Sequence, residues 1–412
     1  MRIKTGMLAR AAFAFLLIFV SSCVSMADRY AGAQRTVSIT AGSLKSRESG
    51  KYTGPKEPDE TPASKIITLK VLLAKTRDSL YITAASKATV PGLNIEPSAG
   101  FSVSRAADGT IIANGISTYL NRIEITCPEN ILKYNRKAYR GSFVIFSGSG
   151  TLMLVNKVEL EQYLYGVLPF EVSTGWEAEA LKAQAVAART FAIYNKLKNK
   201  TPEYDLDSNV NSQVYGGMSK ENPATNDAID RTAGEVLSYN GEVIQAFFHA
   251  NSGGRTASSL EVWGGALDYL PSVDDPFSTK SKGAKWSASI PRDRLSSMVE
   301  KAGYKTGSIY EILIQDRTES GRVGTLKIKG SEGEYVIKAK DLRAAVGVDQ
   351  IRSTNFTVSG GSDSFDFEGL GWGHGVGMSQ EGAGEMAGEG WSYKEILSYY
   401  YKGTKLKKIK IE

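Results

Sequence analysis

The chain has 412 residues, of which 42% are hydrophobic and 23% are charged, and its formal net charge is +6. This composition is ordinary for a globular protein, and the length is sufficient for one or more packed domains. Three of the positive charges fall within the first 22 residues, so the remaining excess is too small to indicate a nucleic-acid partner. A mildly basic surface of this kind suits an anionic wall or membrane.

The amino terminus has the pattern of an export signal. Arg2, Lys4 and Arg10 precede an apolar run at 11–20. That run is shorter than the roughly 20 residues that span a bilayer, and its proportions are those of a secretory signal peptide. We therefore expect residues 1–22 to be a signal peptide and the protein to be exported to the cell envelope.

Small residues precede Cys23 in the sequence Val20-Ser-Ser-Cys23. This order resembles the lipobox of bacterial lipoproteins, which implies that Cys23 is acylated and anchors the mature chain to a membrane. An ordinary secreted protein cleaved nearby is the alternative. Residues 23–62 are rich in proline and charge and have little to bury, so they indicate a tether. With Cys23 acylated, Cys127 has no disulfide partner in the chain, and we expect it to be a small packed residue.

Strand patterns prevail from residue 66 to about residue 160. Alternating apolar residues at 66–73 and 79–83 flank a short polar break. Asp108-Gly109 has the composition of a hairpin turn, and Ser147–Gly150 predicts a second turn.

The first long helix is predicted at 177–198, a run without proline or glycine. Thr174 and Glu177 have the spacing of a capping box. The face predicted to be buried consists mainly of alanines at helical spacing: Leu181, Ala185, Ala188 and Ala192. Such small residues allow a neighbouring backbone to approach closely, so we expect this helix to be buried.

The carboxyl-terminal half contains further strands and a second capped helix. Strands are predicted near 243–248, 310–315, 325–329 and 405–411. Ser392 and Glu395 form a second capping-box pattern, and that helix should end before Gly403. Strands and helices do not alternate regularly, which predicts an α+β fold of mixed or antiparallel sheets rather than a doubly wound sheet.

Only two histidines are present, His249 and His374, which limits the chemistry available. His374 lies in a segment with glycine at every second position from Gly369 to Gly377, a pattern of either a ligand site or a tight packing crossover. A catalytic zinc site requires at least three protein ligands, and neither histidine has a nearby cysteine or an HExxH spacing. No Gly-x-Ser-x-Gly elbow occurs either. We therefore expect no metal and no cofactor.

Glu171 is the strongest candidate for catalysis. It follows Pro169-Phe170, after a strand-like segment at 158–168 and before the long helix, so elements on both sides would hold it. A nearby helix N-terminus favours the ionised carboxylate, whereas burial against Phe170 or Trp176 would raise its pKa. The alternative is a solvated loop glutamate.

Several segments, in order, resemble the SpoIID/LytB family. They are Val158–Val172, Glu179–Thr190, Phe248–Gly254, Val262–Gly264, Tyr269-Leu270, Gly373–Ala383 and Tyr399–Thr404. The resemblance extends from about Lys70 to Lys405. It implies a family domain at 63–405, with core motifs at 155–275 and 365–405, followed by a strand end at 406–412.

The family resemblance implies two alternative functions. The family's enzymes are lytic transglycosylases that act on peptidoglycan glycan strands, including strands stripped of stem peptides, and their essential glutamate corresponds to Glu171. The chain has Phe170 where a small residue is common and Val172 where methionine is common. Other members are named enhancers of wall amidases, so a non-catalytic glycan-binding enhancer with an amidase partner is the second reading.

The matched motifs imply further contacts with the glycan. The residues assigned to substrate binding are Gln184, Arg189, Tyr215, His249, Ser252, Gly253, His374, Ser379 and Gln380. The two histidine segments would meet across a groove, Arg189 would orient a carboxylate or backbone, and Tyr215 and Trp263 offer faces for sugar stacking. Each of these residues has an alternative as a satisfied interior group.

Overall fold

The computed structural model describes residues 67–84, 87–90, 93–95, 100–209 and 212–409. The predicted signal peptide, the predicted acylation site Cys23, the predicted tether and the last residues of the predicted final strand lie outside this range. In the part of the chain that is described, no helix is both long and apolar enough to cross a membrane.

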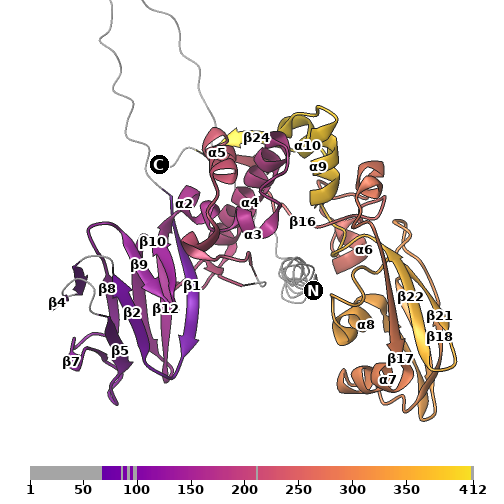
Figure 1. The fold of residues 1–412 in the computed structure, drawn as a ribbon, viewed down its shortest axis with the longest axis horizontal. Helices are drawn as coiled ribbons and strands as arrows, with labels where there is room; N and C mark the ends of the chain where they lie inside the picture. The colour runs from indigo at the N-terminus through magenta and orange to yellow at the C-terminus, as the bar shows by residue number, and fades with distance from the viewer. Residues whose placement is uncertain (1–66, 85–86, 91–92, 96–99, 210–211, 410–412) are drawn as a thin grey trace, which may run out of the picture.

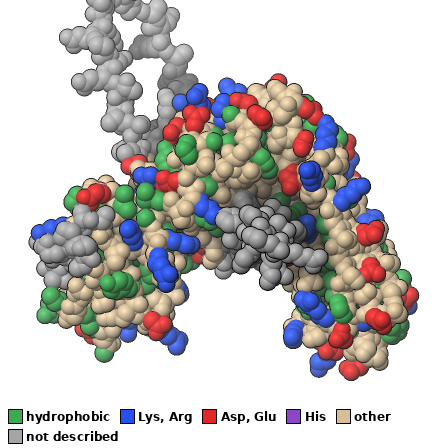
Figure 2. Space-filling view, viewed as in Figure 1, with side chains coloured by type: hydrophobic (Ala, Val, Ile, Leu, Met, Phe, Trp, Pro, Cys, Tyr) green, Lys and Arg blue, Asp and Glu red, His purple; other side chains and the backbone are tan. Residues whose placement is uncertain are grey.

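The described chain forms an arch with three parts (Figure 1). A strand-rich lobe stands at one end, a mainly helical central body forms the top, and a second lobe of strands and helices stands at the other end. The surface view shows the two lobes standing apart below the central body (Figure 2). Strands and helices do not alternate regularly along the chain and the sheets are mixed or antiparallel, so the predicted α+β class is confirmed.

The strand-rich lobe consists of two main sheets. Its strands are β1 (Thr68–Thr76), β2 (Leu80–Ala84), β3 (Ala88–Val90), β4 (Leu93–Ile95), β5 (Phe101–Arg105), β6 (Ile111–Ala113), β7 (Ile116–Ser117), β8 (Arg122–Ile125), β9 (Ile131–Tyr134), β10 (Lys137–Arg140), β11 (Ser142–Gly148) and β12 (Thr151–Glu159). The sheet orders are β13-β1-β12-β11-β8, with β13 (Leu206–Asp207), and β10-β9-β2-β5-β6-β7. Both predicted turns join antiparallel pairs, β5 with β6 and β11 with β12. Cys127 is buried beside this sheet, as expected of a packed residue.

The central body is built around one long helix, α4 (Ala178–Lys198), which is buried along most of its length. Its neighbours are the helices α2 (Leu160–Tyr165), α3 (Leu168–Glu171), α5 (Pro223–Arg231), α9 (Gln380–Gly388) and α10 (Tyr393–Tyr400), the 3-10 helix η3 (Gly217–Lys220), and the strands β14 (Glu235–Tyr239), β15 (Glu242–Val243), β16 (Phe248–His249), β23 (Met378–Ser379) and β24 (Lys405–Lys408). Alanine side chains allow these elements to approach α4 from several sides, which confirms the predicted burial.

Two local predictions in the central body are wrong. The segment 158–168 is mostly helical, because its buried residues Leu160, Tyr163, Leu164, Val167 and Leu168 repeat at helical rather than strand spacing. The capping box at Thr174 does not form, since α4 begins at Ala178 and Glu177 itself occupies the N-cap position without a side-chain bond. The second capping box, at Ser392 and Glu395, is confirmed.

The second lobe has a hydrophobic core of its own. It contains β17 (Lys285–Pro291), α7 (Arg292–Lys301), β18 (Ile309–Ile314), β19 (Thr325–Gly330), β20 (Gly333–Lys338), α8 (Ala339–Val346), β21 (Phe356–Gly360) and β22 (Ser364–Leu370). Its buried cluster includes Ile290, Leu295, Ile328, Leu342 and Phe367, whereas the larger cluster joins the strand-rich lobe to the central body. The helix α6 (Ser259–Trp263) and the 3-10 helix η4 (Pro276–Lys280) lie where this lobe meets the central body, and both pack against the larger hydrophobic cluster. The domain expected at 63–405 therefore packs around two large cores, beside a small third cluster of Val172, Leu181 and Ala228.

Candidate active site

Glu171 is the last residue of the short helix α3, which begins with Leu168 and Pro169. In Figure 1, α3 lies on the side of the central body between the two lobes. The Glu171 side chain is buried, with 6% of the residue exposed. The structure therefore contradicts the alternative of a solvated loop glutamate.

Burial controls the protonation of this carboxyl. Loss of solvent raises the pKa of Glu171 from 4.5 to about 7, while a hydrogen bond from the backbone N–H of Val214 acts in the opposite direction. When Glu171 is ionised, its negative charge contributes to raising the pKa of the nearby buried Tyr163 phenol. A carboxyl with a pKa near neutrality can hold a proton and deliver it to a substrate at the same pH.

Residues 213–217 pack beside α2 and α3. The Tyr163 hydroxyl donates to Gln213 Oε1 at 3.2 Å, and the rings of Tyr163 and Tyr215 lie 4.9 Å apart. Gly216 packs directly against the Phe170 ring, so a larger residue would collide with it. The sequence interpretation missed Tyr163, Gln213 and Val214 as neighbours of Glu171. The Gly216-Gly217 pair was the available signal for a close approach at this segment.

Three other predicted site residues of the central body are enclosed. Tyr215 is 4% exposed and its hydroxyl donates to Asn156 Oδ1 at 2.8 Å, so neither ring face is open for a sugar. Gln184 and Gln380 are also buried, and the Gln380 amide donates to Gln184 Oε1 at 3.5 Å.

Arg189 is fully buried and joins several elements. Its Nη2 lies 2.6 Å from Glu161 Oε2, and its other donors reach the carbonyl oxygens of Ile229 and Glu235 and the hydroxyl of Thr232. The guanidinium thus orients a carboxylate and backbone groups, as the sequence allowed. Because all of these partners belong to the protein itself, we assign Arg189 a structural role.

The two histidine segments meet, as predicted, by direct strand pairing, with His249 fully buried and His374 half-buried. The strands β16 and β23 pair in parallel, and the rings of His249 and His374 lie 5.5 Å apart. Burial lowers the pKa of His249 well below its usual range and that of His374 to about 3, so both rings are neutral. His249 Nδ1 donates to the carbonyl oxygen of Val376, and His374 Nδ1 accepts from the Val376 N–H.

The polar residues beside the histidines are satisfied within the protein. The Ser252 hydroxyl contacts Asp275 and Ser278, each at 2.7 Å, and the Ser379 hydroxyl accepts the N–H of Gly382 at the start of α9. Gly253 has a φ of +72° and packs against the backbone of Leu370. The prediction that the segments come together is therefore confirmed. The two hydroxyls, however, already form hydrogen bonds within the protein. Among the described residues, no group of three or more His, Cys, Asp and Glu is arranged to hold a metal.

The alternating glycines serve this packing. A side chain at Gly373 would lie 2.8 Å from the Cβ atom of His249, and one at Gly375 would lie 2.5 Å from a guanidinium nitrogen of Arg322. Both glycines also have positive φ, at +114° and +87°. Of the two sequence readings, the tight packing crossover fits these contacts, and it brings His374 and Arg322 to one place.

Comparison with known proteins supports the family resemblance of the segment that contains Glu171. The family described as Stage II sporulation protein matches residues 148–239, and a domain of unknown function (DUF8618) matches 275–377. An uncharacterized protein of Brachyspira hyodysenteriae is 37% identical, over 65% of this chain and 71% of the relative.

Two relatives from Bacillus subtilis carry descriptive names. Stage II sporulation protein D is 34% identical over 61% of this chain and 75% of the relative. The protein named Amidase enhancer is 34% identical over 72% of this chain but only 48% of the relative. The molecule is thus an α+β protein, and the segment matched by the family model contains the helices α3 and α4 and the buried Glu171. The chain belongs to the SpoIID/LytB family.

Proposed function

We propose that this protein is a peptidoglycan lytic transglycosylase and that Glu171 is its catalytic acid and base. Family membership supports a role at the cell wall in general terms. The observation that carries the proposal is the buried carboxyl of Glu171, whose pKa is raised to about 7 at the end of α3.

The reaction needs one carboxyl that first gives and then accepts a proton. Neutral Glu171 donates its proton to the oxygen that links N-acetylmuramic acid to N-acetylglucosamine, and the bond from that oxygen to muramoyl C1 breaks. The carboxylate then takes the proton of the muramoyl C6 hydroxyl, whose oxygen bonds to C1 and gives a 1,6-anhydro end. No water has to be positioned on the opposite face, so the second carboxylate of ordinary glycosidases is not required.

The surroundings of Glu171 support both steps. Burial makes the neutral form available near pH 7, and the Val214 N–H stabilises the carboxylate formed after the first transfer. Tyr163 and Gln213 hydrogen-bond to each other beside α3, which limits movement of the segment that carries Val214.

The direct test replaces Glu171 by glutamine, which keeps size and hydrogen bonding but cannot deliver the proton. We expect glycan cleavage to fall by about 10²–10⁴-fold or more, with glycan binding retained. The matched control is Glu177→Gln, an exposed glutamate at the N-cap of α4 without a side-chain cap bond, which should cleave like the parent. Equal loss in both variants, or no loss in Glu171→Gln, would remove Glu171 from the mechanism.

A second candidate is a glycan-binding protein that stimulates a wall amidase without cleaving glycan. It is supported by the relative named Amidase enhancer, of which this chain spans about half the length. Absence of cleavage by the wild type, together with amidase stimulation that survives Glu171→Gln, would favour this candidate.

We also propose that the protein is exported and held at a membrane through acylated Cys23. The support is the order of basic, apolar and small residues before Cys23 in the sequence. Cys23→Ala should release the protein into the soluble fraction, while the near-UV circular dichroism of the folded part stays unchanged. A variant that still fractionates with membranes would disprove the anchor.

A further inference from the structure

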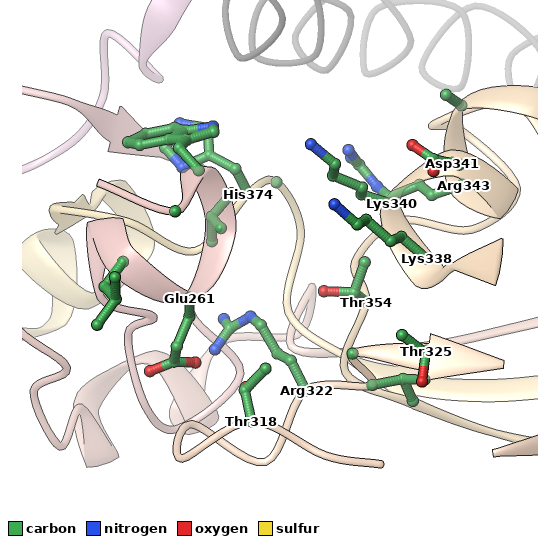
Figure 3. A pocket seen from close by; sticks show the side chains of 18 residues that line it. Glu261, Thr318, Arg322, Thr325, Lys338, Lys340, Asp341, Arg343, Thr354 and His374 are labelled. Atoms are coloured by element: carbon green, nitrogen blue, oxygen red, sulfur yellow. The ribbon is translucent and has the colours of Figure 1, made fainter. Parts of the chain in front are cut away.

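A pocket of about 370 Å³ lies between α6 and the second lobe, and Glu171 is not among its lining residues. Its walls come from α6, from residues 318–325, from the junction of β20 with α8, and from His374 (Figure 3). The volume falls at the lower end of the roughly 300–1,000 Å³ typical of small-molecule sites. It suits one monosaccharide unit better than a long oligomer.

The lining of this pocket is cationic. Four of its side chains are basic, Arg322, Lys338, Lys340 and Arg343, and two are acidic, Glu261 and Asp341. The Lys338 and Lys340 side chains extend across the pocket toward the side that holds His374 and Glu261 (Figure 3). In the part of the chain that is described, neither lysine forms an ion pair.

Arg322 is a buried cation that forms no ion pair within the described residues. The residue is 2% exposed, its two terminal nitrogens donate to the carbonyl oxygens of Arg255 and Ser252, and its Nε has no hydrogen-bond partner among the described residues. Glu261, an acid on the same lining, interacts with Arg322 electrostatically and accepts hydrogen bonds from Ser258 and Ser320. Glu261 attracts this enclosed charge without forming an ion pair with it, and the Nε has no partner among the described residues, so a bound anion would stabilise the arrangement further.

One wall of the pocket is aromatic. The rings of Trp263 and His374 lie 5.4 Å apart, and Trp263 also packs on Phe247 at 4.3 Å. His374 is uncharged, since its pKa is lowered to about 3 by burial and by the neighbouring arginines. The indole Nε1 of Trp263 is buried and has no partner within the described residues. An aromatic wall with a free donor, opposite cationic side chains, is the arrangement expected around a charged sugar.

We propose that this pocket binds an anionic sugar residue, with the pyranose ring at Trp263 and His374 and its oxyanion facing Arg322, Lys338 and Lys340. The oxyanion is a carboxylate, as on a muramoyl unit without its stem peptide, or a phosphate, as on a sugar phosphate. The proposal rests on the proposed function only for the expectation that the protein acts on cell-wall glycan. It does not depend on cleavage at Glu171.

Calorimetric titration of the full chain tests this site. The probes are N-acetylmuramic acid, N-acetylglucosamine 6-phosphate, uncharged N-acetylglucosamine and inorganic phosphate. We expect one of the two charged sugars to bind more tightly than either N-acetylglucosamine or phosphate alone, and its affinity to fall as salt increases. The preferred charged sugar identifies the source of the oxyanion.

The decisive variant is Lys338→Ala/Lys340→Ala, which removes two cations from the rim without disturbing the core. This double substitution should weaken the binding of the charged sugar at least about tenfold and leave the affinity for N-acetylglucosamine unchanged. Lys301→Ala/Lys305→Ala removes the same charge from exposed positions of the same lobe and should bind like the parent.

Three results would overturn the site. They are equal affinity for charged and uncharged sugars, unchanged binding in Lys338→Ala/Lys340→Ala, or inorganic phosphate binding as tightly as the sugars. Titrating Glu171→Gln separates the two proposals, because the pocket should bind its sugar normally in that variant whether or not cleavage is lost.

Discussion

Two glutamates ten positions apart in the central body have opposite electrostatic environments. Glu161, on α2, pairs with the buried guanidinium of Arg189 at 2.6 Å and also accepts the Gly234 N–H. Glu171, on α3, is more deeply buried, and burial raises its pKa to about 7 against the hydrogen bond from Val214. The first carboxylate therefore joins elements of the fold, whereas the second can exchange a proton near neutral pH.

The same contrast separates the buried arginines. Arg189 has a carboxylate partner, whereas Arg322 forms no ion pair within the described residues and burial lowers its pKa to about 10. A charged group that the protein leaves uncompensated is therefore a guide to where a ligand acts, and a compensated one is a guide to what holds the fold.

The largest expected effect on stability in this comparison is a pH-dependent gain in Glu171→Gln. In the folded protein Glu171 is protonated below about pH 7, whereas in the unfolded chain it loses its proton above pH 4.5. The folded state binds the extra proton between these values, so this contribution to stability is lost as the pH rises through that window. Its size is on the order of 3 kcal/mol.

Glutamine does not titrate, so Glu171→Gln should gain stability relative to the parent between pH 4.5 and 7 and keep that gain at pH 8. Urea unfolding at pH 4, 6 and 8 measures it, with Glu177→Gln as the control that should follow the parent. A constant difference between Glu171→Gln and the parent at all three pH values would contradict the raised pKa.

A smaller effect, a loss of folding stability, is expected from Glu161→Gln at pH 7. This change leaves the fully buried Arg189 without its counter-ion. Broken buried pairs cost about 3–5 kcal/mol, and because 29% of the Glu161 side chain is exposed we expect about 2 kcal/mol. Urea unfolding at pH 7 provides the measurement. If the variant is as stable as the parent, then Arg189 does not depend on Glu161 and the contrast between the two glutamates fails.

Local sequence patterns predicted much of the fold. The hairpin turns at Asp108-Gly109 and Ser147–Gly150, the buried α4 and the cap at Ser392 each depend on neighbouring residues, and each is confirmed. The segment at 158–168 was mistaken for a strand although its buried positions already had helical spacing.

In the candidate sites, too, contiguous motifs could be predicted from the sequence, whereas contacts between distant segments could not. Glu171 could be named from the sequence because its motif is contiguous, but its burial depends on packing from distant segments, including the backbone near Val214. The histidine segments were correctly predicted to meet, yet their burial followed from glycine packing that only the structure displays. The cationic pocket was not foreseen, since Arg322 and Lys340 come from separate elements and belong to no local motif.

Identification of the new glycan ends tests the central proposal most directly. Purified glycan strands, with and without stem peptides, would be incubated with the wild type and with Glu171→Gln, and the products separated and weighed by mass spectrometry. The account predicts 1,6-anhydro-muramoyl ends from the wild type and almost none from Glu171→Gln. Reducing ends from the wild type would mean that water is the acceptor, and would contradict the assignment of both proton transfers to Glu171 alone.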